Sequence, residues 1–216
     1  MVTELLMPAI VISALVAIVL VILYLERKRS KELAALALTM GFTFNPEGDD
    51  VLNQGLAPLR LFQWGHPGKP ENVLRGSLGG LEVTLFDYSY TIGSGKGRRT
   101  FHQTACAFHL KDKSLPDFEL RPENIFHKIG AVFGYQDIDF DNSPEFSKRY
   151  LLRTTSPDSV RVLFRSDSIQ FFEREKGWSV EGGGSWFMVY QHNLRVKPEN
   201  MRGFLETSYN ILTKFK

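Results

Sequence analysis

The sequence predicts an α+β protein in which an N-terminal transmembrane helix is followed by a mostly antiparallel sheet domain packed with three to four helices. Three observations carry this prediction. An uncharged apolar run occupies residues 7–25, strand-like segments come in groups joined by glycine-rich turns, and helix-like segments with capping residues lie between the groups. Strands grouped in this way favour antiparallel pairing over a doubly wound fold. We therefore divide the chain into a transmembrane anchor with its basic flank, 1–29, and a cytoplasmic α+β domain, 30–216.

The apolar run reads MPAIVISALVAIVLVILYL, and Ser13 is its only strongly polar side chain. At about 1.5 Å of rise per residue, a helix over residues 7–25 spans roughly 28 Å, which is close to the thickness of the hydrocarbon core of a bilayer. A helix satisfies its own backbone hydrogen bonds in lipid, so a single helix is a suitable way to cross it. We therefore expect this segment to span a membrane.

Three other interpretations of this run fit less well. A cleaved signal peptide has a basic start and a cleavage site of small residues, whereas residues 1–6 contain no Lys or Arg and a charged stretch, 26–29, follows the run. A buried core helix is rarely apolar on every face at this length, and an interfacial helix would need a polar face. We expect a permanent anchor.

Charges on the two sides of the run orient it. Glu4 precedes the run without any cation, whereas Arg27, Lys28, Arg29 and Lys31 follow it. Cytoplasmic flanks carry the excess of Lys and Arg. The sequence therefore predicts a single-pass protein of the cell inner (plasma) membrane, with its N-terminus outside and its domain in the cytoplasm.

The composition excludes one class of partner and supports a packed core. The 26 Lys and Arg nearly balance 24 Asp and Glu, for a net charge of +2, which is too mild to indicate nucleic-acid binding. The 17 Phe, 7 Tyr and 3 Trp supply enough bulk for a core. The single cysteine, Cys106, cannot form an intrachain disulfide, which fits a reducing compartment.

The first half of the domain is predicted to be rich in strands. Ser30 suits the N-cap of a helix over 30–40, which either continues the membrane helix or hinges away from it, and Gly41 closes this helix. The stretch 46–72 is rich in Gly, Pro, Asn and Asp and is expected to be a loop, with a possible strand at 59–62. Strands are expected at 42–44, 73–78, 81–90 and 100–110. A Gly-Gly pair joins the middle two as a tight hairpin.

The second half is predicted to alternate between helices and strands. Pro122 suits the first turn of a helix that runs from 121 to about 133. Ser156 caps a helix that runs to about 173, with a hairpin turning at Ser166 as the alternative for 160–173. The remaining expected elements are strands at 135–140, 149–153, 178–181 and 186–190 and a final helix over 198–214.

A basic turn occupies residues 93–99, Gly-Ser-Gly-Lys-Gly-Arg-Arg. A phosphate-binding P-loop needs G-x4-G-K-[ST] between a strand and a helix. Here Tyr90 stands in place of the first glycine and a strand follows, so we interpret the segment as a hairpin turn. Its three cations, Lys96, Arg98 and Arg99, are suited to contact anionic lipid or an acidic partner.

Two further groups have residue types found in metal sites. Asp137, Asp139 and Asp141 alternate, so on a strand they share one face, but the EF-hand pattern is not met. Cys106 lies between His102 and His109, a spacing that does not converge as a zinc site requires. A solvated strand face and a buried thiol are the favoured interpretations, and we assign no catalytic, cofactor-binding or metal-binding residue.

Several strings occur together in an order that resembles a known group of proteins. They are Phe86-Asp-Tyr-Ser-Tyr90, Gly95-Lys96, Gln103-Thr104, Leu115-Pro-Asp-Phe118, Arg121-Pro-Glu123 and 134–140. The chain resembles bacterial membrane-anchored proteins with one N-terminal transmembrane helix and an FDYxY-containing cytoplasmic domain. The resemblance covers most of residues 30–216 and implies a bacterial origin and an anchored layout. It implies no activity, so no site residue is transferred.

The leading functional hypothesis is an interaction or binding domain at the cytoplasmic membrane face. The expected partners are the membrane, spanned by 7–25, and other membrane or cytoplasmic proteins, with no nucleic acid and no cofactor. One alternative is a membrane-tethered hydrolase or metal-dependent enzyme that uses Asp137, Asp139 or His102. The other is a domain that senses anionic lipid through the basic turn at 93–99.

Overall fold

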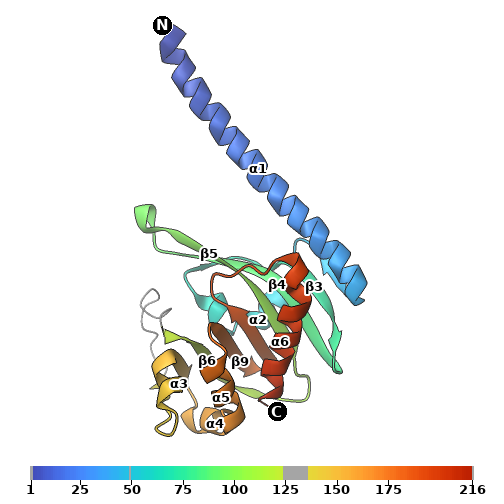
Figure 1. Ribbon diagram of the computed structural model, residues 1–216, viewed down its shortest axis with the longest axis vertical. Helices are drawn as coiled ribbons and strands as arrows, with labels where there is room; N and C mark the ends of the chain where they lie inside the picture. Colours follow the sequence, from blue (N-terminus) through green and yellow to red (C-terminus); the bar gives the residue numbers. More distant parts are fainter. Residues whose placement is uncertain (1, 49, 124–135, 216) are drawn as a thin grey trace.

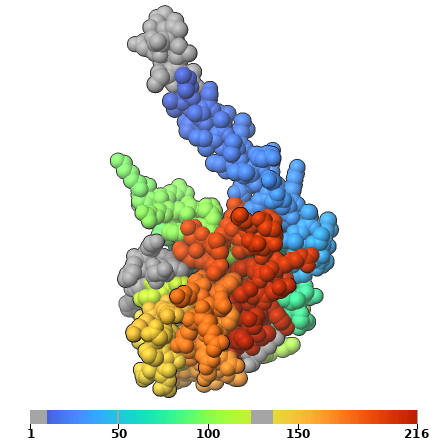
Figure 2. All heavy atoms as spheres, viewed as in Figure 1, coloured from blue at the N-terminus to red at the C-terminus, as the bar shows by residue number. Residues whose placement is uncertain are grey.

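Helix α1 (Val2–Met40) runs without a break into a domain built on one sheet (Figure 1). The computed structural model describes residues 2–48, 50–123 and 136–215. The side chains of residues 10–25 are all exposed, and Figure 2 shows this part of α1 standing clear of the domain. By length and composition, α1 can cross a membrane. The expected helix over 30–40 is therefore the continuation of α1, without a hinge.

The sheet has the strand order β1-β3-β4-β5-β10-β9-β6-β8-β7, with β2 paired to β4 beside this path. Every strand pairing in the described chain is antiparallel, which confirms the predicted α+β class. The strands are β1 (Thr43–Asn45), β2 (His66–Pro67), β3 (Glu71–Leu78), β4 (Leu81–Ile92), β5 (Arg99–His109), β6 (Leu115–Pro122), β7 (Gln136–Asp137), β8 (Tyr150–Thr154), β9 (Trp178–Gly184) and β10 (Trp186–Gln191).

The Gly-Gly turn between β3 and β4 is present as predicted. Gly79 and Gly80 have φ angles of 59° and 78°, a left-handed conformation that glycine adopts without steric cost. The turn brings Leu78 opposite Leu81 and starts the pairing that runs back along both strands. The strands expected at 178–181 and 186–190 are also present, as β9 and β10, which pair as a hairpin from Trp186–Gly183 to Gln191–Trp178.

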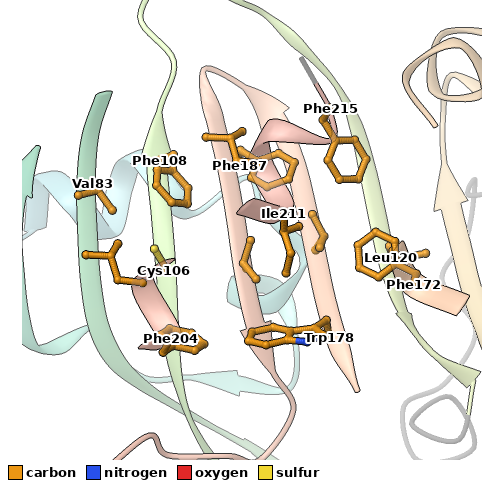
Figure 3. Close-up of a cluster of buried hydrophobic side chains, with 14 of the residues drawn as sticks. Val83, Cys106, Phe108, Leu120, Phe172, Trp178, Phe187, Phe204, Ile211 and Phe215 are labelled. Atoms are coloured by element: carbon orange, nitrogen blue, oxygen red, sulfur yellow. The ribbon is translucent and has the colours of Figure 1, made fainter. Parts of the chain in front are cut away.

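One face of the sheet is packed against α1 and α6. Successive strand residues alternate between the two faces, so Cys106 and Phe108 of β5 share a face with Phe187 of β10, over which α6 lies (Figure 3). The second half of α1 joins this core through Leu33 and Ala37, which are 1% and 0% exposed. The end of the candidate membrane helix is therefore also a core helix of the domain.

The opposite face carries an aromatic cluster beneath α2 and η1. Phe86, Tyr88 and Tyr90, the alternate residues of β4, all point to this face and are buried. The ring centroids of Phe62 and Tyr88 lie 4.4 Å apart, and Trp64 contacts Tyr90 edge-on at 5.3 Å. The FDYSY string thus places its three aromatic rings in one core and its Asp87 on the other side of the sheet.

The helices differ from the prediction in number and position. In the described parts of the chain, the helices beyond α1 are α2 (Asp50–Leu56), α3 (Pro144–Arg149), α4 (Pro157–Leu163), α5 (Ser166–Arg174) and α6 (Met201–Thr213), with 3-10 turns η1 (Arg60–Gln63), η2 (Gly95–Gly97) and η4 (Pro198–Asn200). The stretch 46–72 is therefore not only loop, because α2 and η1 lie in it. Leu52 and Leu56 are buried there, so two apolar residues are enough for the short helix α2 to pack against the sheet.

Two predicted helices need correction. Arg121 and Pro122 end strand β6 and do not open a helix, whereas the rest of the expected helix, 124–133, lies outside the described residues. The segment 156–173 is neither one helix nor a hairpin but two helices, α4 and α5. Phe164 between them is buried against Phe215, with ring centroids 5.0 Å apart, and this packing favours the break.

Candidate functional site

The candidate site is the joint between α1 and the sheet, centred on Asp87. The guanidinium of Arg29 donates two hydrogen bonds to this carboxylate, from Nε to Oδ2 at 2.8 Å and from Nη2 to Oδ1 at 2.7 Å. Both side chains are largely buried, at 13% and 7% exposure. Two-point pairing between a planar guanidinium and a carboxylate adds orientation as well as energy. The helix is therefore held at a defined angle to β4.

A second arginine completes the joint from the loop after β10. Arg195 binds Glu26 of α1 at two points, both 2.6 Å, and also donates to Asp87 Oδ2 at 3.3 Å. Thr104 of β5 donates its hydroxyl to Asp87 Oδ1 at 2.9 Å, and Asn72 donates its amide to Oδ2 at 3.1 Å. Residues far apart in the chain thus meet at one carboxylate, which satisfies the buried charge.

Opposing effects set the charge state of this joint. Burial by itself raises the pKa of Asp87, but hydrogen bonding and charge from Arg29, with further charge from Arg195, outweigh it and leave the pKa below its ordinary value. The bonds that Arg195 makes with Glu26 raise the pKa of the guanidinium further. Asp87 is therefore ionised at neutral pH and the joint is a network of full charges.

The spacing along α1 explains why these residues face the sheet. Glu26, Arg29, Leu33 and Ala37 follow one another at intervals of three or four residues, which places them on one side of a helix. The last two are in the core and the first two make the polar contacts. This side of α1 is therefore apolar where the helix is packed in the core and charged where the helix leaves the domain.

A cavity of about 460 Å³ opens beside this joint. Arg27 and Ser30 of α1 line one side, and Ser89 and His102 of the sheet line the other. Glu71 and Arg195 also contribute, so the lining combines both signs of charge. The cavity lies where the apolar part of α1 gives way to its charged part.

The basic turn at 93–99 is the tip of the β4–β5 hairpin, as predicted. Lys96, Arg98 and Arg99 are all exposed there. No strand–loop–helix arrangement surrounds the turn, because β5 follows η2 directly. The turn therefore displays its cations outward and lacks the helix that a P-loop requires.

The residues of the enzyme hypothesis do not come together. Asp137 of β7 receives a hydrogen bond of 2.7 Å from Arg153, whereas Asp139 is exposed. His102 lies on β5, which the strands β10, β9, β6 and β8 separate from β7. Within the described ranges, no three His, Cys, Asp or Glu side chains are grouped to hold a metal ion.

The cysteine and its neighbouring histidines are also apart. Cys106 is fully buried in the core beneath α6, and burial raises the pKa of its thiol strongly. His109 sits at the far end of β5, where it contacts Glu82 at 3.1 Å and stacks on Trp186. A buried thiol is what the sequence favoured, and these groups form no shared site.

Sequence reasoning missed a buried charged row on the aromatic face. Glu119 of β6 lies opposite Arg153 of β8 on one side and opposite Glu181 of β9 on the other. Glu181 accepts a hydrogen bond of 2.7 Å from the Tyr190 hydroxyl and another from the Leu61 amide at 3.1 Å. Burial first, and then the charge of Glu119, raise the pKa of Glu181 to about 8. The alternation Phe-Glu-Leu-Arg at 118–121 was the available signal for this strand.

The comparisons with known proteins add a likeness in fold. No family model matches the chain, and no curated protein matches it, so the FDYxY resemblance stays a prediction. A solved structure that matches is the mycobacterial trehalose monomycolate transport factor A, TtfA, with 15% sequence identity and a TM-score of 0.59. The match covers 88% of this chain and 97% of that one. At this identity the likeness shows that the two chains share a fold.

Proposed function

We propose that this chain is a single-pass, membrane-anchored, non-catalytic interaction domain that works at the cytoplasmic membrane face. The observation that carries the proposal is the joint at Asp87, because it builds the end of the anchor into the domain. Arg29 and Glu26 bind the sheet side, and Leu33 lies in the core of the domain. The domain thereby presents one fixed side to the bilayer.

A fixed joint suits an interaction role better than a tethered enzyme. An enzyme that acts on soluble substrates needs only a linker, and flexible linkers leave the orientation of a domain free. Here no linker separates the anchor from the domain, since α1 is continuous from Val2 to Met40. The charged contacts at Asp87 and the burial of Leu33 and Ala37 supply the stiffness. A fixed orientation of the domain is useful when the domain must bind a partner in or near the membrane.

The same contacts support a permanent anchor. Cleavage near residue 25 would remove the apolar part of a helix whose next turns, from Glu26 onward, are bonded to the sheet. The cations Arg27, Lys28 and Lys31 follow the apolar run and favour a cytoplasmic position for the domain. A reporter fused after Lys216 tests this orientation. Cytoplasmic activity of the reporter is expected, and periplasmic activity would contradict it.

The neighbour's name fits this proposal. TtfA is named as a transport factor for trehalose monomycolate, and the shared fold makes an accessory role beside a membrane component the natural comparison for this chain too. A single apolar helix encloses no pathway of its own. We therefore propose that the domain acts by contacting another component at the membrane.

A linker insertion tests whether the fixed orientation matters. A flexible Gly-Ser segment placed between Leu25 and Glu26 keeps the joint at Asp87 intact but frees the domain from the membrane helix. A photoreactive amino acid at Val51, which is 78% exposed, or at Val162, which is 73% exposed, reports contacts in cells. We expect a discrete crosslinked partner in the parent chain and its loss in the linker variant.

The matched control places the same insertion after Lys113 in the exposed β5–β6 loop. This variant lengthens the chain equally and leaves α1 continuous, so its crosslinks should equal those of the parent. A crosslinked partner that survives insertion after Leu25 would show that orientation is irrelevant. A parent chain that yields no discrete adduct from either position would contradict the interaction role.

A further inference from the structure

The β4–β5 hairpin extends from the domain toward the same end as the apolar part of α1. In Figure 1, drawn with the longest axis vertical, the hairpin projects from the upper left of the domain, at the end from which α1 also extends, and Figure 2 shows its tip projecting from the domain. Strand β10 pairs with β5 only from Ala105 onward, and β2 reaches only Tyr90 and Thr91. Beyond these points the two strands pair with each other, to Ile92 opposite Arg99.

The base of this hairpin is firmly held. Tyr90 stacks on Phe101 across the two strands, with ring centroids 5.3 Å apart. The hydroxyl groups of Thr91 and Thr100 share a hydrogen bond of 2.9 Å on the opposite side. Pairing is continuous from Glu82 to Ile92, without a bulge. The hairpin is therefore a stiff extension of the sheet, and the joint at Asp87 fixes its position relative to α1.

The tip is shaped to display cations. Gly93 has a φ of 75°, and a Cβ atom on it would lie 2.6 Å from the carbonyl oxygen of Gly97. The resulting tight turn leaves Lys96 and Arg98 exposed, together with Arg99. Residues 93–100 contain no acidic side chain, and no ion pair among the described residues involves these three cations.

The other end of the sheet lacks this excess of charge. In the β5–β6 loop, Lys111 is paired with Glu82 at 2.6 Å, and Asp112 follows it. The uncompensated cations thus lie at the end that faces the apolar part of α1. The second basic group of the chain, at Arg27 and Lys28, lies on that helix just after its apolar run.

From this placement we propose that Lys96, Arg98 and Arg99 bind anionic phospholipid headgroups of the leaflet from which α1 emerges. This inference rests on the membrane-anchored function proposed above. The cytoplasmic leaflet is anionic, and basic side chains near its surface are attracted to it. The tip fits a lipid surface better than a protein, because its other residues are Gly and Ser and it offers no apolar or aromatic anchor of the kind that dominates protein interfaces. Two contacts, α1 and the hairpin, then set the tilt of the domain.

The test uses the full-length chain in lipid nanodiscs with a fluorophore at the tip. Ser94 is exposed and its side chain makes no capping bond, so Ser94→Cys provides the attachment point, while the native Cys106 is buried and unreactive. Discs contain phosphatidylcholine alone or phosphatidylcholine with phosphatidylglycerol. A nitroxide on the phosphatidylcholine headgroup quenches the fluorophore only when the tip is close to the surface.

We expect quenching to rise about twofold when phosphatidylglycerol is present and to return to the neutral-disc level in concentrated salt, which screens exposed charges. A fluorophore at Ser114, in the exposed loop at the opposite end of the sheet, should not respond. Quenching at Ser94→Cys that is equal in both lipids would overturn the proposal.

Matched charge variants complete the test. Replacing Lys96, Arg98 and Arg99 together with Gln should abolish the response, whereas replacing Lys111 and Lys113 with Gln should preserve it. A response that persists without the three tip cations would overturn the proposal. If the chain does not enter the discs, the anchor is refuted, together with the lipid contact that depends on it. This outcome is recognised separately, because the chain then does not co-purify with the discs.

Discussion

Arg29 of α1 and Asp87 of β4, 58 residues apart in the chain, are joined by two hydrogen bonds of 2.8 and 2.7 Å. The pair connects the helix that is suited to cross a membrane with a strand in the interior of the sheet. Because both side chains are largely buried, removing either one deprives the other of its main charged partner in a place with little access to water. Substitutions at this pair therefore test directly how much the joint contributes to stability.

Replacing Asp87 with Ala should destabilise the domain strongly. The change leaves the buried guanidinium of Arg29 without its acceptor, and breaking a buried ion pair from one side costs about 3–5 kcal/mol. Urea unfolding of the full-length protein in detergent, followed by tryptophan fluorescence, measures the free energy of unfolding. Asp139→Ala, at an exposed position, is the control and should change it little. Equal stability of the two variants would show that the joint does not hold the fold.

The stability of the joint should depend on acid. The folded-state pKa of Asp87 lies below its unfolded value, so its contribution is present above the unfolded pKa of about 3.9 and is lost as pH falls through the folded pKa. The melting temperature of the native chain should therefore fall more steeply below about pH 4 than that of Asp87→Asn, which does not titrate there. Parallel curves for the two proteins would contradict this.

The titration of Glu181 should have the opposite effect on stability, which it lowers as the pH rises. Its pKa is raised to about 8 in the folded state by burial and by Glu119. Its stabilising contribution is therefore complete below the unfolded pKa of about 4.3 and declines as pH rises toward the folded value. Glu181→Gln removes this titration and should flatten the decline in melting temperature between pH 6 and about 8.5. Leu61 and Tyr190, the partners of this carboxylate, keep an acceptor in the amide oxygen.

Two glycine substitutions should have opposite effects. A Cβ at Gly76 would lie 2.2 Å from the ring of Phe42, so Gly76→Ala must displace a core side chain and should cost about 1–3 kcal/mol. A Cβ at Gly203, within α6, would instead meet open space, so Gly203→Ala should stabilise the protein by about 0.5–1 kcal/mol. Urea unfolding of both variants, with the native chain as reference, measures the difference. A stabilising Gly76→Ala would contradict the close contact.

Three predicted elements with strong local signals were found, whereas helix α2, which has a weak one, was missed. The run at 7–25, the Gly-Gly turn and the last helix each carry a periodicity or a turn signal within a few residues, so local physics decides them. Helix α2 has only Leu52 and Leu56 as buried residues and lies in a segment rich in turn-forming residues. It is stabilised by packing against the sheet, which a local sequence pattern does not reveal. Strand β6 alternates apolar and charged residues, and its charged side is buried only because η1 and its neighbours enclose it.

The sequence by itself determined the apolar helix at 7–25, the α+β class and the exposed basic turn at 93–99, because these depend on composition and short-range pattern. The tertiary structure decided what those features do together. Asp87 reads in the sequence as one acid between two aromatic residues, and only the antiparallel order of the strands brings Arg29, Arg195 and Thr104 to it. Contacts between residues 17 to 108 positions apart follow from sheet topology, which no local pattern specifies.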